Sequence, residues 1–81
     1  MTGADGPVGR RHWIDMIGDG GRWTDPVGLR LEARNLSSAA ISLLAEFALE
    51  NPSPGGTWSA EVRTEEGRVV LTATLTSTYH R

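Results

Sequence analysis

The strongest constraint on the fold is a β-hairpin predicted in the C-terminal half of the chain. Apolar and polar residues alternate along 57–64 and again along 68–78, as they do on half-buried strands. Only Glu65, Glu66 and Gly67 separate the two runs, and Gly67 suits the positive φ angle of a tight connection. Strands joined by so short a turn pair antiparallel. We expect the longer run, rich in β-branched residues, at the centre of the sheet.

A strand and a helix precede this hairpin. Residues 27–34 alternate and predict a strand, whereas 38–50 carry apolar residues at helical spacing. Ser37 is the expected N-cap, and the helix is expected to end before Asn51, because the residue preceding Pro52 is biased away from helical geometry. A right-handed crossover through this helix would make the first two strands parallel.

Glycine sets the N-terminal third of the chain apart. Seven of the ten glycines lie within residues 1–28. Residues 1–11 are expected to form a flexible arm, because they can bury little apolar surface. Within Arg11–Gly18, apolar residues recur at helical spacing (Trp13, Met16 and Ile17) and predict one or two helical turns, which the glycines at 18, 20 and 21 end.

These elements predict an α+β fold with the order short helix, strand, long helix, strand, strand. We expect a single α/β domain over residues 12–81, because a chain of 81 residues is too short for two cores. The three strands would lie in the spatial order 1-3-2, with the long helix on one face. This small two-layer sandwich is half of a ferredoxin-like unit. A half-unit leaves surfaces that a second half would cover.

The expected stability of so short a chain is marginal. Apolar burial contributes on the order of 120 kcal/mol at about 25 cal/mol per Å², and ordering the chain costs about the same at about 1.5 kcal/mol per residue. The long helix also has a narrower polar stripe than a solvent-facing helix requires. Together these features predict a non-enzymatic protein–protein interaction module of regulatory, inhibitor or assembly type. Such a module would complete its fold by pairing with itself or with a larger protein.

The expected interface combines a flank of the long helix with two tryptophans from the N-terminal third. Its residues are Trp13, Trp23, Ile41, Ala45, Ala48 and Leu49. A second interpretation stays open, in which the two tryptophans fold over that flank within the same chain. Periodicity and composition do not distinguish the two interpretations.

An alternative function follows from arginine, which supplies all eight basic residues. A nucleic-acid-binding module would use an arginine patch on the outward sheet face and at the N-terminal arm. Its residues would be Arg10, Arg11, Arg30, Arg34 and Arg63. The net charge of −2 and the absence of an expected outward-facing aromatic residue argue against this function. We therefore rank protein above nucleic acid as the partner.

No pattern of catalytic, cofactor-binding or metal-ligating residues emerges. The chain has no cysteine, and its two histidines lie near opposite ends. His12, Asp15 and Asp19 could share a helix face, but glycines would break that helix before Asp19. A small oligomeric enzyme or ligand-binding protein, with its site at a subunit interface, is the third function class. We expect no cofactor, no membrane partner and a cytoplasmic location, since no apolar run approaches a membrane span.

Overall fold

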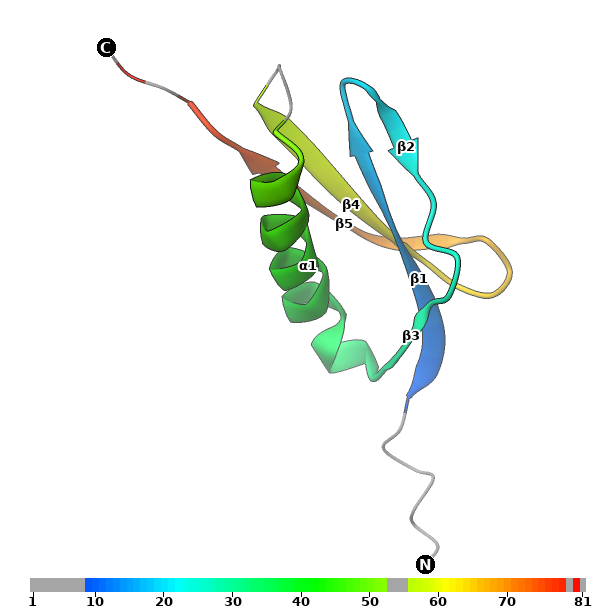
Figure 1. Cartoon of the computed structure of the whole chain (residues 1–81). Helices are drawn as coiled ribbons and strands as arrows, with labels where there is room; N and C mark the ends of the chain where they lie inside the picture. Colours follow the sequence, from blue (N-terminus) through cyan, green and yellow to red (C-terminus); the bar gives the residue numbers. More distant parts are fainter. Residues whose placement is uncertain (1–8, 53–55, 79, 81) are drawn as a thin grey trace, which may run out of the picture.

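One helix packs against one face of a five-stranded antiparallel sheet (Figure 1). The computed structural model describes residues 9–52, 56–78 and 80. In chain order the elements are β1 (Arg10–Gly18), β2 (Gly21–Trp23), β3 (Leu29–Leu31), a 3₁₀ turn (Ala33–Asn35), α1 (Leu36–Glu50), β4 (Thr57–Arg63) and β5 (Val69–Thr76). The α+β class is therefore confirmed. The number and order of the strands differ from the prediction.

The sheet follows the order β2-β1-β4-β5, and the short β3 pairs with the N-terminal half of β1. Every pairing is antiparallel. The predicted three-stranded order 1-3-2 is wrong, and so is the central position of the longest predicted strand. Since β1 pairs along β4 on the side away from β5, β5 becomes an edge of the sheet among the described residues. The predicted half-ferredoxin topology is therefore also wrong, and so is its parallel crossover.

Residues 12–17 belong to β1 and not to the predicted helix. Ile14 lies opposite Val62 and Met16 opposite Ala60, and all four are buried. The helical spacing of their apolar side chains is overridden, because strands on both sides of β1 satisfy its backbone and cover its side chains. The strand also includes Arg10 and Arg11, which the prediction placed in the arm. The rest of that arm, residues 1–8, lies outside the described residues.

α1 ends at Glu50 as predicted, but it begins at Leu36 with Asn35 as its cap residue. Ser37 is therefore not the N-cap. The 3₁₀ turn over Ala33–Asn35 leads directly into the helix, so the chain is already coiled before Ser37. The same turn shortens the strand predicted over 27–34 to the three residues of β3.

The core lies between α1 and the face of the sheet that α1 covers. The predicted inward residues of β4 are all buried there, which confirms the alternation of that strand. The buried apolar residues are Ile14, Met16, Leu36, Ala40, Leu44, Trp58, Ala60 and Val62. At one end of the core, the Phe47 ring lies edge-on to Trp58 at 4.9 Å and to Trp23 at 5.6 Å between centroids. Trp23 thus packs against the helix of its own chain.

The β4–β5 hairpin forms as predicted. The Thr64 N–H donates to the Arg68 carbonyl at 2.9 Å, and Gly67 adopts a φ angle of 88° that closes the turn. The turn of this hairpin carries two glutamates, Glu65 and Glu66. Among the described residues, the single α-helix lacks the length and the hydrophobicity to span a lipid bilayer.

Candidate functional site

Most of the polar and charged side chains of the sheet lie on the face that α1 leaves open. Successive side chains of a strand point to opposite faces, so the strand register assigns each residue to one face. The side chains on this helix-free face are Arg11, Trp13, Asp15 and Ile17 of β1, Arg22 of β2, Arg30 of β3, Thr57, Ser59, Glu61 and Arg63 of β4, and Thr72, Thr74 and Thr76 of β5. An ion-pair network lies on this face, a cleft lies at one end of the sheet, and a further candidate surface lies beside β5.

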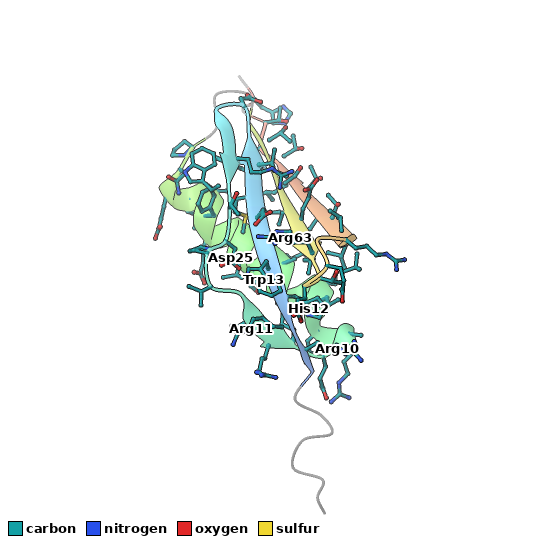
Figure 2. All side chains as sticks on the ribbon, turned by 90° about the vertical axis from the view of Figure 1, so that its right-hand side faces the viewer. Arg10, Arg11, His12, Trp13, Asp25 and Arg63 are labelled. Carbon is teal, nitrogen blue, oxygen red and sulfur yellow. The ribbon has the colours of Figure 1, made fainter. Side chains whose placement is uncertain are left out.

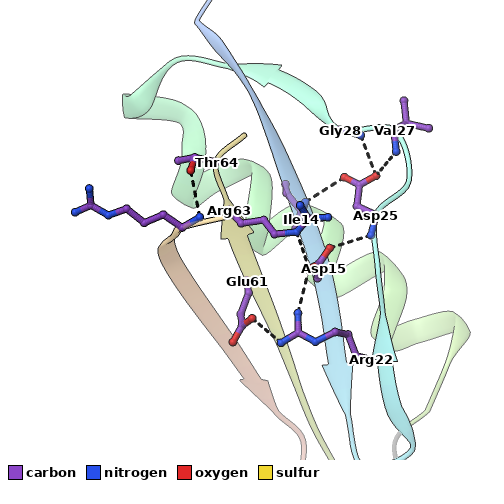
Figure 3. A network of polar contacts seen from close by, with 10 residues as sticks. Ile14, Asp15, Arg22, Asp25, Val27, Gly28, Glu61, Arg63 and Thr64 are labelled. Carbon is purple, nitrogen blue, oxygen red and sulfur yellow. Dashed lines mark hydrogen bonds and ion pairs between the residues drawn. The ribbon is translucent and has the colours of Figure 1, made fainter. Parts of the chain in front are cut away.

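Asp15 is the centre of an ion-pair network on this face (Figure 3). Its side chain is 3% exposed, and its Oδ2 accepts hydrogen bonds from Arg22 Nη1 at 3.0 Å and Arg63 Nε at 2.9 Å. Its Oδ1 accepts the Asp25 N–H at 2.9 Å, and Arg22 also binds Glu61 at 2.8 Å. Burial raises the pKa of Asp15, but the Arg63 hydrogen bond, the Asp25 N–H and the two arginine charges outweigh it, so the pKa is lowered.

Asp25 holds the connection between β2 and β3 against β1. Its Oδ2 accepts the Ile14 N–H at 3.0 Å, and its Oδ1 accepts the N–H groups of Val27 and Gly28 at 3.0 Å each. Burial raises the pKa of Asp25, but these three donors and the charge of Arg63 lower it by more. Since both aspartates are held ionised by fixed donors, they serve as structural counter-charges and are poor candidates for acid–base chemistry.

A cleft opens at the end of the sheet where β1 extends past β4. The pairing of β1 with β4 begins at Trp13, whereas β1 starts at Arg10, so the β4–β5 hairpin diverges from the first residues of β1. The space between them measures about 740 Å³. We call it the sheet-end cleft. The side chains that determine its character are Arg10, Arg11, Arg30, Trp13, Glu65 and Glu66.

Three of the five arginines of the predicted patch line this cleft. Arg11 and Arg30 lie directly opposite each other on β1 and β3. Arg11 Nη1 donates to the Val27 carbonyl at 2.9 Å, and Arg10 lies at the start of the same strand. Figure 2 shows Arg10 to Trp13 following one another along the N-terminal half of β1. The structure therefore gathers Arg10, Arg11 and Arg30 at one site.

The other two arginines of the predicted patch are engaged elsewhere. Arg34 lies on the 3₁₀ turn and pairs with Glu32 at 2.9 Å. Arg63 binds Asp15, and its guanidinium carbon lies 5.6 Å from the ring centroid of Trp13. Trp13 therefore lies on the helix-free face, with the sheet between it and the helix flank to which it was predicted to belong. It supplies the outward aromatic residue that the sequence analysis did not find.

A second surface lies beside β5, along one flank of α1. Ile41 and Leu49 are 55% and 84% exposed, Ala45 is exposed, and Ala48 is half-buried against the core. At 100° per residue these four lie on the flank opposite to the one that meets Trp23. Four of the six residues of the predicted interface thus share one surface.

The free edge of β5 adjoins this flank. The Ser77 N–H donates to the Gly56 carbonyl, on the β4 side. Backbone groups alternate in direction along an antiparallel strand, so those of Thr72, Thr74 and Thr76 point away from β4. Val69–Thr76 contains no charged residue and no proline. We call this edge, together with Ile41, Ala45, Ala48 and Leu49, the β5 surface.

The sequence patterns do not predict two features of the structure, the Asp15 network and the free edge of β5. The sequence does not predict the Asp15 network, because the spacing of Trp13, Met16 and Ile17 predicts a helix at this position. A strand assignment for 10–18 would have placed Arg11, Trp13 and Asp15 on one face, although not beside Arg63. The free edge of β5 was missed for the same reason, because the strand that displaces β5 from the centre was not recognised. Within the described residues, no group of three or more histidine or acidic side chains is arranged to hold a metal ion.

Comparison with known proteins places the chain in a family without assigning it a function. No curated protein matches the chain, and no solved structure matches it. One family model, described as Domain of unknown function (DUF6894), matches residues 11–76, which cover the helix and the whole sheet apart from Arg10. Because this match spans most of the 81 residues, the chain belongs to the DUF6894 family.

Proposed function

We propose that this chain is a non-enzymatic interaction module whose partner is a second copy of itself. The observation that carries the proposal is the β5 surface, in which a strand edge that no other described strand pairs with adjoins an exposed apolar helix flank. Edge strands of natural proteins are usually protected by charged residues, proline or a covering segment. β5 has neither charge nor proline among its eight residues. An edge of this kind is suited to pairing with another strand.

The sequence of β5 is self-complementary in an antiparallel pair. A two-fold axis at Ala73 would set Thr72 opposite Thr74 of the second copy, and Leu71 opposite its Leu75. Directly opposed residues share a face in an antiparallel ladder. The threonines would therefore stay on the helix-free face, the leucines would stay on the helix side, and the outward backbone groups of Thr72 and Thr74 would gain partners.

The position of α1 also suits such a pair. The helix packs over β4 and β5 to about the same extent, and neighbouring strands lie about 4.8 Å apart. Joining two copies at β5 would place the two helix axes about 10 Å apart, which is close to the usual helix-packing distance. Ile41 and Leu49 of each copy would then meet, with the small Ala45 between them allowing close approach.

The test is the molecular mass of the full chain in solution, measured by light scattering and by sedimentation equilibrium. We expect twice the 8.7 kDa of one chain at tens of micromolar. Leu49→Glu should return the protein to a monomer, whereas Leu43→Glu, the same change on the flank facing Trp23, should leave the dimer intact. Thr72→Pro removes an N–H that points away from β4 and should also give a folded monomer, which circular dichroism would verify. A wild-type monomer would refute the proposal.

A second candidate function, nucleic-acid binding, gains support from one observation. Trp13 lies on the same face as Arg11 and Arg30, so the face offers both a stacking ring and positive charge. It ranks second because Arg34 and Arg63 are engaged elsewhere. An electrophoretic shift that survives moderate salt would place it first.

The third function class, a site at a subunit interface, is not favoured by the proposed dimer. His12 and Trp13 do line the same cleft. This cleft, however, lies on the β1 side of β4, whereas the proposed seam follows the far edge of β5. A regulatory, inhibitor or assembly role and a cytoplasmic location stay predictions.

A further inference from the structure

We infer that the sheet-end cleft binds a small oxyanion, a phosphate or a carboxylate group, between Arg11 and Arg30. This site lies away from the β5 surface and does not depend on the proposed dimer. The inference rests on a pair of positive charges that the fold places opposite each other and that form no ion pair with any described residue. It also rests on a comparison within the same sheet, where a second arginine pair does have a counter-charge.

Arg11 and Arg30 are direct cross-strand partners on the helix-free face. Like charges placed opposite each other in this way destabilise a sheet. Among the described residues, neither arginine takes part in an ion pair, and the hydrogen bond of Arg11 goes to the neutral carbonyl of Val27. An anion between the two guanidinium groups would turn this repulsion into two charge-assisted hydrogen bonds.

In the Asp15 network, by contrast, one carboxylate balances the charge of two arginines. On the same face and the same strand β1, the Asp15 carboxylate lies between Arg22 and Arg63, with N–O distances of 3.0 and 2.9 Å. Arg11 and Arg30 are also two arginines on this face, but they lie directly opposite each other on adjacent strands, and neither forms an ion pair with a described carboxylate. The oxygen atoms of a bound phosphate or carboxylate would take the place that Asp15 fills in the network.

The backbone adds a donor on the β4 side of the cleft. The Ile14 N–H points to the β2–β3 side of β1, where it meets Asp25, so the N–H of Arg11 points to the β4 side. The ladder with β4 begins only at Trp13. The Arg11 N–H therefore faces the cleft with no strand opposite it. The Arg11 N–H is thus a further donor on the wall of the cleft, on the opposite side of β1 from the Val27 carbonyl that the Arg11 guanidinium binds.

The opposite wall of the cleft limits the ligand to a small anion. Glu65 and Glu66 lie across from three arginines, so these five lining side chains carry a net charge of +1 (three positive and two negative charges). A polyanion running through the cleft would bring its further phosphates against the two glutamates. This charge balance favours a single phosphate or carboxylate group over a nucleic-acid strand.

The first experiment titrates the ¹⁵N-labelled full chain with inorganic phosphate, with acetate and with a short oligothymidylate. The reporters are the Trp13 indole N–H, assigned through Trp13→Phe, and the Arg11 amide. Trp23 and Trp58 serve as internal controls, because they lie in the aromatic cluster on the helix side. We expect saturable shifts confined to the cleft. Arg30→Ala should weaken binding about tenfold or more, since it removes a charge-assisted hydrogen bond. Arg34→Ala, which removes an equally charged residue outside the cleft, should have no effect.

The second experiment measures thermal unfolding in phosphate and in potassium chloride of equal ionic strength. Phosphate should raise the melting temperature of the wild type more than chloride does, and Arg30→Ala should abolish the difference. Stronger binding of phosphate than of acetate would identify the ligand as a phosphate group. Stronger binding of acetate would identify it as a carboxylate group. If phosphate and chloride raise the melting temperature equally, the effect is charge screening and not binding at a site, and the inference is overturned. Binding of the oligothymidylate without a response to phosphate or acetate would overturn it in favour of nucleic acid.

Discussion

Replacing Asp15 with asparagine would test whether one buried carboxylate holds the sheet together. The side chain keeps its shape but loses its charge, and its new NH₂ group must face a donor. It meets either the Asp25 N–H or the Arg22 and Arg63 guanidinium groups. The substitution therefore leaves Arg63, whose side chain is 25% exposed, short of its counter-charge.

The expected loss can be worked out from these contacts. Arg22 is half exposed and keeps its bond to Glu61, so its bond to Asp15 contributes little. The Arg63 and Asp25 bonds to Asp15 are shielded, and the loss of one of them, together with the weakening of the other as the charge is removed, costs about 2–4 kcal/mol. A domain of this length has a total unfolding free energy of about 4–12 kcal/mol. Asp15→Asn should thus remove roughly a third of the stability and lower the melting temperature by on the order of 10–20 °C.

Thermal and urea unfolding, followed by far-ultraviolet circular dichroism at pH 7, would measure the effect. Glu32→Gln is the matched control, because its partner Arg34 is 80% exposed and the pair should contribute less than about 1 kcal/mol. Equal losses in the two variants would refute the structural role of Asp15.

The pH dependence gives an independent check. The pKa of Asp15 is lower in the folded protein than in the unfolded chain. Its contribution is therefore complete above the unfolded value, about 3.9, and is lost as the pH falls through the folded value. The stability difference between wild type and Asp15→Asn should shrink below about pH 4. A difference that stays constant down to low pH would show that the charge of Asp15 is not its cause.

Three further substitutions test the packing and the bracing of β1. Gly18→Ala would set a Cβ about 2.5 Å from the Trp58 ring and should cost about 1–3 kcal/mol with a changed near-ultraviolet spectrum; an unchanged spectrum would contradict this. Phe47→Ala should cost about 3 kcal/mol because it opens the cluster with Trp23 and Trp58, whereas truncation of the exposed Val27 side chain in Val27→Ala should cost under about 0.5 kcal/mol. Asp25→Ala should cost about 2–3 kcal/mol and speed hydrogen exchange at the Ile14 amide, and retained protection there would rule out the bracing role.

The sequence by itself determined the elements whose signals are local. The end of α1 before Pro52 and the hairpin closed by Gly67 follow from backbone restrictions at single residues. The inward set of β4 follows from strict alternation. The apolar flank with Ile41 and Leu49 follows from helical spacing, and the structure places it where a partner could reach it. Each of these depends on residues close together in the chain.

Only the tertiary structure decided the features that depend on distant pairings. Residues 12–17 have a spacing that suits a helix, and they become a strand because β4 and two short strands satisfy its backbone from both sides. That strand displaces β5 to the edge and sets Trp13 beside Arg63, far along the chain. The Asp15 network and the sheet-end cleft follow from the same register. Local pattern carries no information on which strands pair, because pairing free energy is gained only when segments remote in sequence meet.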